Sequence, residues 1–143
     1  MASEIFVNLA VKDLKKSKAF FSKLGFACNP MFTDENAASM IIGKNIHVML
    51  LLEKFFKGFL PGREICDTAR HTETLTALSL ESRLAVDKMI ASAISAGGKE
   101  YRQTQDYGWM YQRAFMDLDG HIWELGHMDM EKMPEEMKKK GRG

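Results

Sequence analysis

The sequence has little cysteine and no apolar run long enough to cross a membrane. Two of its 143 residues are cysteines, and these, Cys28 and Cys66, stand far apart without a CxxC spacing. A disulfide framework or a cysteine-rich zinc module is therefore not indicated. Because we also find no signal-peptide pattern and no stretch of about 18 apolar residues, we expect a cytoplasmic protein with no membrane partner.

The chain also lacks a strong excess of charge of either sign. Its formal net charge is +1, which gives no general attraction to nucleic acid. Positive charge is concentrated only near the end, in Lys138, Lys139, Lys140 and Arg142. A short terminal run of this kind is typical of a solvated tail, so we expect no nucleic-acid partner.

Apolar residues alternate in some stretches and recur at helical spacing in others, and the order of these stretches repeats. Asp13 and Ser82 are typical residues to cap the start of a helix, and Gly25 and Gly97 are typical residues to end one. The expected elements are a strand over 5–11, a helix from 14 to 24, strands over 26–33, 37–42 and 46–52, a strand over 75–80, a helix from 83 to 96, a strand over 99–104 and a hairpin over 107–128.

This repeat predicts an α+β fold of two tandem βαβββ modules that form a curved half-barrel. We expect one domain over 1–128, with a first module at 4–52, a connector at 53–73 and a second module at 74–128. The remaining residues, 129–143, form a C-terminal tail in which a short helix begins near Pro134.

The hairpin carries the most informative side chains. A four-residue loop from Asp117 to Gly120 pairs Phe115 with Ile122 and Arg113 with Glu124. One side of the hairpin then mixes aromatic rings with one cation and one carboxylate, which suits the wall of a pocket. That predicted inner side consists of Trp109, Tyr111, Arg113, Phe115, Ile122 and Glu124, and the opposite side, predicted to be covered by a helix, holds Met110, Ala114, Met116, Trp123 and Leu125.

Three stretches together resemble the vicinal-oxygen-chelate superfamily, which includes glyoxalase I, bleomycin-resistance proteins, fosfomycin-modifying transferases and extradiol dioxygenases. These are the two βαβββ patterns, the segment VKDLKKSKAFFSKLGF and the signature DLDGHIWEL. The runs ALSLESRLAVDKMIASAISAGGKE and QDYGWMYQRAFMDLDGHIWE are similar to bacterial proteins described as predicted lactoylglutathione lyases. Since one scaffold carries many activities, the resemblance implies the fold more specifically than the function.

The resemblance also implies where a metal would be held. Metal enzymes of the superfamily place His, Glu or Gln at four inward positions, which fall here on Phe6 (with Asn8 nearby), at or next to Leu50, on Leu75 and on Glu124. Only Glu124 has ligand chemistry, whereas a divalent site needs about three N, O or S donors. We therefore expect no cofactor and no Zn, Ni or Mn ion. A non-standard site at His47 and Glu124 is the less favoured alternative.

Without a metal, the expected ligand site is a cavity lined by aromatic and apolar side chains. The candidate ligand-binding residues are Phe6, Asn8, Met49, Leu75, Trp109, Tyr111, Arg113, Phe115 and Glu124. The pattern of strand 46–52 leaves open whether Val48, Leu50 and Leu52 or His47, Met49 and Leu51 face inward. In the connector, Phe55, Phe56 and Phe59 form either a flap over the pocket or a seal between the modules.

Three functions compete on these residues. The first is metal-independent binding of a small amphipathic or aromatic molecule, within one chain or across a homodimer. The second is a glyoxalase-like lyase or isomerase with Glu124 as the base and Arg113 stabilising developing negative charge. The third is a dimerisation module without a ligand. A purely structural ion pair between Arg113 and Glu124 is the plain alternative to a catalytic one.

Overall fold

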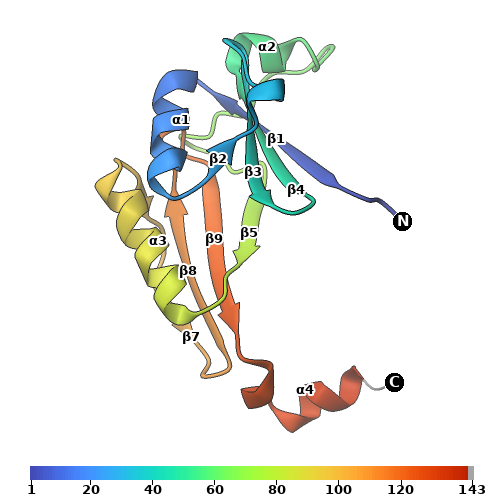
Figure 1. The fold of residues 1–143 in the computed structure, drawn as a ribbon, viewed down its shortest axis with the longest axis vertical. Coiled ribbons are helices and arrows are strands. Elements are labelled where there is room, and N and C mark those ends of the chain that lie inside the picture. Colours follow the sequence, from blue (N-terminus) through green and yellow to red (C-terminus); the bar gives the residue numbers. More distant parts are fainter. Residues whose placement is uncertain (142–143) are drawn as a thin grey trace.

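The computed structural model describes residues 1–141, and it confirms the α+β class and the two βαβββ modules (Figure 1). Arg142, a part of the predicted basic tail, lies outside the described residues. The first module contains β1 (Ile5–Val11), α1 (Leu14–Lys23), β2 (Ala27–Cys28), the 3-10 turn η1 (Pro30–Phe32), β3 (Ala37–Gly43) and β4 (Ile46–Leu52). A short helix, α2 (Glu53–Lys57), opens the connector.

The second module repeats this order with an additional short strand. It contains β5 (Leu75–Ser79), α3 (Arg83–Ser95), β6 (Lys99–Glu100), β7 (Gln105–Asp106), β8 (Met110–Met116) and β9 (Ile122–Met128), and the tail then forms η2 (Met130–Lys132) and α4 (Glu135–Lys140). Figure 1 shows α1 and α3 close together and α4 apart from the body of the protein. No helix within residues 1–141 is both long enough and apolar enough to span a bilayer.

Each module builds its own mixed sheet. The strand order is β1-β4-β3-β2 in the first sheet and β5-β9-β8-β6 in the second, with β7 also paired to β8. In both sheets the first strand of the module runs parallel to the last, and the other pairs are antiparallel. Within the described part of the chain, the strands β1 and β5 therefore each occupy an outer position and pair with a neighbouring strand on one side.

The helices begin and end where the sequence predicts. The side chain of Asp13 accepts a hydrogen bond from the backbone N–H of Lys16 at 3.0 Å, and the hydroxyl of Ser82 accepts one from Ala85 at 3.0 Å. Past their ends, Gly25 and Gly97 have φ angles of 99° and 107°, which cost glycine little.

The two modules share one core around an aromatic cluster. Phe20 and Phe21 of α1 meet Phe115 of β8 and Trp123 of β9, with ring centroids 6.1 Å apart for Phe20 and Phe115 and 5.1 Å apart for Phe21 and Trp123. All four side chains are almost completely buried. Since they come from both modules, burying them stabilises each module only in the presence of the other.

The predicted register of the hairpin is wrong by one residue. The structure pairs Met116 with Ile122, Ala114 with Glu124 and Arg113 with Leu125, so the connection has five residues. The cause is Asp117, which is buried and whose carboxylate accepts hydrogen bonds from the N–H groups of Asp119 and His121 and from the indole of Trp123, each at 3.0 Å. A slip of one residue moves every side chain of one strand to the opposite side.

Two predicted strands are much shorter than expected. The stretch 26–33 contains only β2 before η1 begins, because the side chain of Asn29 caps the N–H of Met31 at 3.0 Å. The stretch 99–104 contains only β6, since Arg102 adopts a φ of 57° that no strand tolerates.

Candidate functional site

A cavity lies in the first module, on the side of its sheet that faces away from α1. Its volume is about 800 Å³, within the usual range for small-molecule sites. The walls come from β1, β3, β4, η1 and α2 and from the residues that follow α2. They consist of Asn8, Met31, Phe32, Thr33, Asp34, Ala37, Met49, Leu51, Phe55, Phe56, Phe59 and Leu60.

Alternation along the strands positions the floor of this cavity. Val48 and Leu50 are fully buried in the core, whereas Met49 and Leu51 line the cavity from the other side of β4. This resolves the open question of which side of the strand faces inward. Asn8 is the register partner of Met49 on the adjacent strand and lines the cavity beside it.

The connector provides an aromatic wall. Phe55, Phe56 and Phe59 all line the cavity, and the rings of Phe55 and Phe59 meet edge to face with centroids 5.2 Å apart. Phe59 is 65% exposed, so this wall stands at the mouth. The three rings therefore border the cavity.

Glu124 lies on the other module and outside this cavity. It lies with Ile122 on the side of the second sheet that faces away from α3, and its carboxylate pairs with the guanidinium of Arg102, which also donates to Gln112 at 2.7 Å. The side chain of Glu124 is 14% exposed. Sequence reasoning missed Arg102 and Gln112, although the correct register would have placed Gln112 on the side of Glu124.

Arg113, the predicted partner of Glu124, faces the helix instead. Its guanidinium donates to Asp87 of α3 at 2.8 Å and to Glu100 at 2.8 Å, and the hydroxyl of Tyr111 donates to Asp87 at 2.6 Å. Burial alone would lower the pKa of Arg113, but these two carboxylates raise it above its ordinary value. Arg113 and Tyr111 therefore fasten α3 to β8 and do not line the cavity.

The other predicted site residues are dispersed. Phe115 is fully buried in the aromatic cluster, and Trp109 borders a surface hollow beside Ser82 and Arg83, at the start of α3. Phe6 is 53% exposed and stacks on His47 with centroids 4.5 Å apart, and Leu75 is 51% exposed. The predicted aromatic inner wall of the hairpin is thus wrong, and of the predicted ligand-binding residues Asn8 and Met49 line the cavity.

The side chains at the positions implied for a metal do not fit a divalent ion. Phe6 and Leu75 offer no lone pair, Leu50 is buried in the core, and Glu124 is paired with Arg102. Within residues 1–141, no three His, Cys, Asp or Glu side chains come together in a way that could hold a metal ion. This donor set gives no basis for a step through a bound metal.

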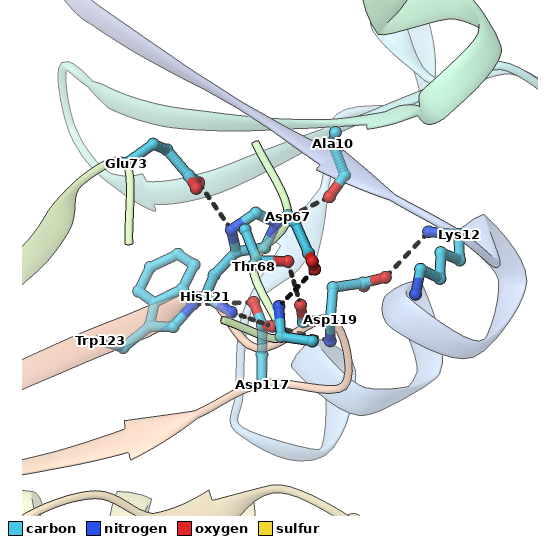
Figure 2. A network of polar contacts seen from close by, with 10 residues as sticks. Ala10, Lys12, Asp67, Thr68, Glu73, Asp117, Asp119, His121 and Trp123 are labelled. Atoms are coloured by element: carbon cyan, nitrogen blue, oxygen red, sulfur yellow. Dashed lines mark hydrogen bonds and ion pairs between the residues drawn. The ribbon is translucent and has the colours of Figure 1, made fainter. Parts of the chain in front are cut away.

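A second polar cluster joins the modules at the start of β9 (Figure 2). The ring of His121 is 5% exposed, and its Nδ1 lies 2.8 Å from a carboxylate oxygen of Glu73 while its Nε2 lies 2.6 Å from the carbonyl oxygen of Ala10. Beside it, Asp119 accepts a hydrogen bond from the N–H of Lys12 at 2.9 Å. The contacts of His121 with Ala10 and of Asp119 with Lys12 connect the second module to the residues around the end of β1.

Comparisons with known proteins agree with this fold. Residues 5–43 match the family model described as bleomycin resistance protein-like N-terminal. The hypothetical protein SA1046 from S. aureus is 27% identical with a TM-score of 0.74, and the match covers 89% of this chain and 95% of that one. A search of curated proteins finds no match.

Two further solved structures share the fold at lower identity. A glyoxalase/bleomycin resistance protein/dioxygenase family enzyme from Burkholderia phytofirmans is 17% identical, with a TM-score of 0.72 and coverage of 86% of this chain and 96% of that one. A glyoxalase-related enzyme from Fulvimarina pelagi is 18% identical, with a TM-score of 0.72 and coverage of 88% of each chain. The similarity to predicted lactoylglutathione lyases stays a prediction. By the family model over residues 5–43 and the fold of its whole length, the chain is similar to proteins of the glyoxalase/bleomycin resistance/dioxygenase superfamily.

Proposed function

We propose that this protein binds a small amphipathic or aromatic molecule in the cavity of its first module, without a metal ion. The observation that carries the proposal is the cavity itself, whose lining is mostly aromatic and aliphatic. Four phenylalanines border it, and rings of this kind stack on flat apolar guests. Asn8, Thr33 and Asp34 add the few polar groups that orient a ligand.

A titration of metal-depleted protein tests this proposal. The neutral fluorophore N-phenyl-1-naphthylamine should bind saturably to protein dialysed against a chelator, and added Zn²⁺ or Ni²⁺ should leave its Kd unchanged. Phe59→Ala removes one exposed ring from the mouth and should weaken binding about tenfold, which corresponds to ~1.4 kcal/mol of lost contact.

Tyr107→Ala is the matched control, since Tyr107 is also an exposed aromatic residue but does not line the cavity. It should leave the Kd unchanged. Equal losses in the two variants would locate binding elsewhere, and the lack of saturable binding in the wild type would refute the proposal.

A glyoxalase-like lyase or isomerase with Glu124 as the base is the second candidate. Glu124 favours it because this carboxylate lies beside a guanidinium, on the side of the second sheet that faces away from α3. Arg102 takes the role that the sequence gave to Arg113, as the cation beside this base. Turnover of a glutathione hemithioacetal by the wild type, lost in Glu124→Gln, would favour this candidate over simple binding.

We also propose that two copies of the chain associate. Ile5, Phe6 and Leu75 expose more than half of their surface on the outer strands β1 and β5, and such apolar sheet edges commonly pair. Light scattering after size exclusion should give a mass near twice 16.2 kDa, and Phe6→Asp should shift it toward the monomer. A dimer without any ligand binding would favour the third function, a dimerisation module.

A further inference from the structure

We propose that the cavity of the first module selects ligands that carry a positive charge, such as aryl-alkyl amines, over neutral or anionic molecules with the same apolar body. This inference rests on the proposed binding function and names its ligand class. It is carried by the charges around the cavity: among the lining side chains of residues 1–141, Asp34 is the one ionisable residue, and none is a lysine, arginine or histidine.

The carboxylate of Asp34 is held in place with one oxygen available. Its Oδ1 accepts hydrogen bonds from the N–H of Asn36 at 2.8 Å and of Ala37 at 3.0 Å, which fixes the turn before β3. Within residues 1–141, its Oδ2 has no hydrogen bond and Asp34 forms no ion pair. A preorganised acceptor at the mouth of an apolar cavity suits an ammonium or guanidinium group.

The lysines nearest in sequence to the aromatic wall do not line this cavity. Lys54 and Lys57 of α2 border a different hollow together with Glu53 and Glu64. A cationic ligand in the cavity therefore meets a carboxylate and the faces of phenyl rings, both of which attract positive charge. An anion would lose its hydration there without gaining a cationic partner.

The same charges argue against a glutathione adduct in this cavity. Such an adduct carries two carboxylates and one ammonium group, so its net charge is negative, and the lining provides no group to pair with either carboxylate. The two candidate functions thus separate in space, with amine binding at the first module and any chemistry of Glu124 on the second.

Three naphthalene probes that differ only in their head group test this inference. These are 2-(1-naphthyl)ethylamine, 2-(1-naphthyl)ethanol and the anion of 1-naphthaleneacetic acid (the acetate), each titrated at low ionic strength. The amine should bind about three- to tenfold more tightly than the alcohol, because an exposed ion pair and a cation–π contact each contribute modestly, and the acetate should bind most weakly. Adding ~0.5 M NaCl should narrow the difference between amine and alcohol.

Asp34→Asn isolates the charge. Asparagine keeps an oxygen that can accept the same two backbone hydrogen bonds, so the turn is retained. In this variant the ratio of the Kd values for alcohol and amine should fall to about one, while the Kd for the alcohol is unchanged. Asp13→Asn is the control, since it makes the same change of charge at a capping residue that does not line the cavity.

The outcomes distinguish this inference from the function on which it rests. If the alcohol binds but the amine is no tighter, or if Asp13→Asn reduces the ratio as much as Asp34→Asn does, charge selection at Asp34 is wrong and the binding function stands. If none of the three probes binds saturably, both are wrong.

Discussion

Arg102 combines an unfavourable backbone conformation with two favourable side-chain contacts. It is the one residue other than glycine with positive φ in the described chain, at 57°, a conformation that costs a β-carbon-bearing residue about 1–2 kcal/mol. Its guanidinium pairs with Glu124 and donates to Gln112 at 2.7 Å. The contacts of Glu124 and Gln112 are therefore made by a residue that the local sequence does not favour in this conformation.

Two substitutions separate these effects. Both Arg102→Ala and Arg102→Gly remove the guanidinium, but only glycine relieves the backbone. We expect the glycine variant to be more stable than the alanine variant by ~1 kcal/mol in the free energy of unfolding from urea titration. Equal stabilities, or a more stable alanine variant, would mean that the turn at Arg102 is not strained.

At the same scale, the sequence predicted some cavity residues and not others for a simple reason. Alternation along β1 put Asn8 on the side opposite Leu9, whereas the pattern of β4 left the facing of Met49 open, and both residues line the cavity. Phe55, Phe56 and Phe59 stood out by their helical spacing. Nothing local identified Arg102, because a positive φ at arginine has no sequence signal.

At the scale of elements, the helices and long strands were predictable from the sequence. The side of the hairpin to which each β8 residue points was not. The bounds of β1 and β4 match the prediction, and both predicted caps are formed. The hairpin failed because its turn depends on the burial of Asp117 under Trp123, which is a tertiary event. One extra residue then moved Tyr111, Arg113 and Phe115 from the expected pocket to the helix side.

The same turn is also constrained from outside the hairpin. Gly120 has a φ of 86°, and a β-carbon there would lie 2.5 Å from the carbonyl oxygen of Thr68 in the connector. The hydroxyl of Thr68 in turn donates to the carbonyl oxygen of Asp119. The five-residue turn is therefore shaped by the connector that packs on it as much as by its own residues.

At the scale of the whole molecule, His121 links the connector and the start of the second hairpin strand to the first module. Its two ring nitrogens face acceptors only, the carboxylate of Glu73 at 2.8 Å and the carbonyl oxygen of Ala10 at 2.6 Å. Both nitrogens must donate to satisfy these contacts, so the ring is the charged imidazolium. Burial by itself would lower the pKa of His121, but Asp117, the Ala10 carbonyl and Glu73 together raise it.

This linkage predicts that stability decreases as the pH rises above neutrality. A histidine whose pKa is higher in the folded than in the unfolded protein contributes its full stabilisation below the unfolded value of about 6.5, and it loses that stabilisation as the pH rises through the folded value. We expect the free energy of unfolding of the wild type to decrease between pH 6 and 9. His121→Gln should be destabilised at pH 6 by ~1–3 kcal/mol. Its free energy of unfolding should decrease less between pH 6 and 9 than that of the wild type.

His71→Gln controls for histidine titration in general, because His71 is an exposed residue of the connector. His71→Gln should retain the pH dependence of the free energy of unfolding seen in the wild type. Glu73→Gln should reduce that pH dependence, because it removes one of the acceptors that favour the imidazolium. The two modules already share the aromatic cluster, so the variants should still fold, and the pH dependence isolates the polar link between them. The same slope in wild type and His121→Gln would show that His121 gains no proton on folding and that its contacts do not contribute to the pH dependence of stability.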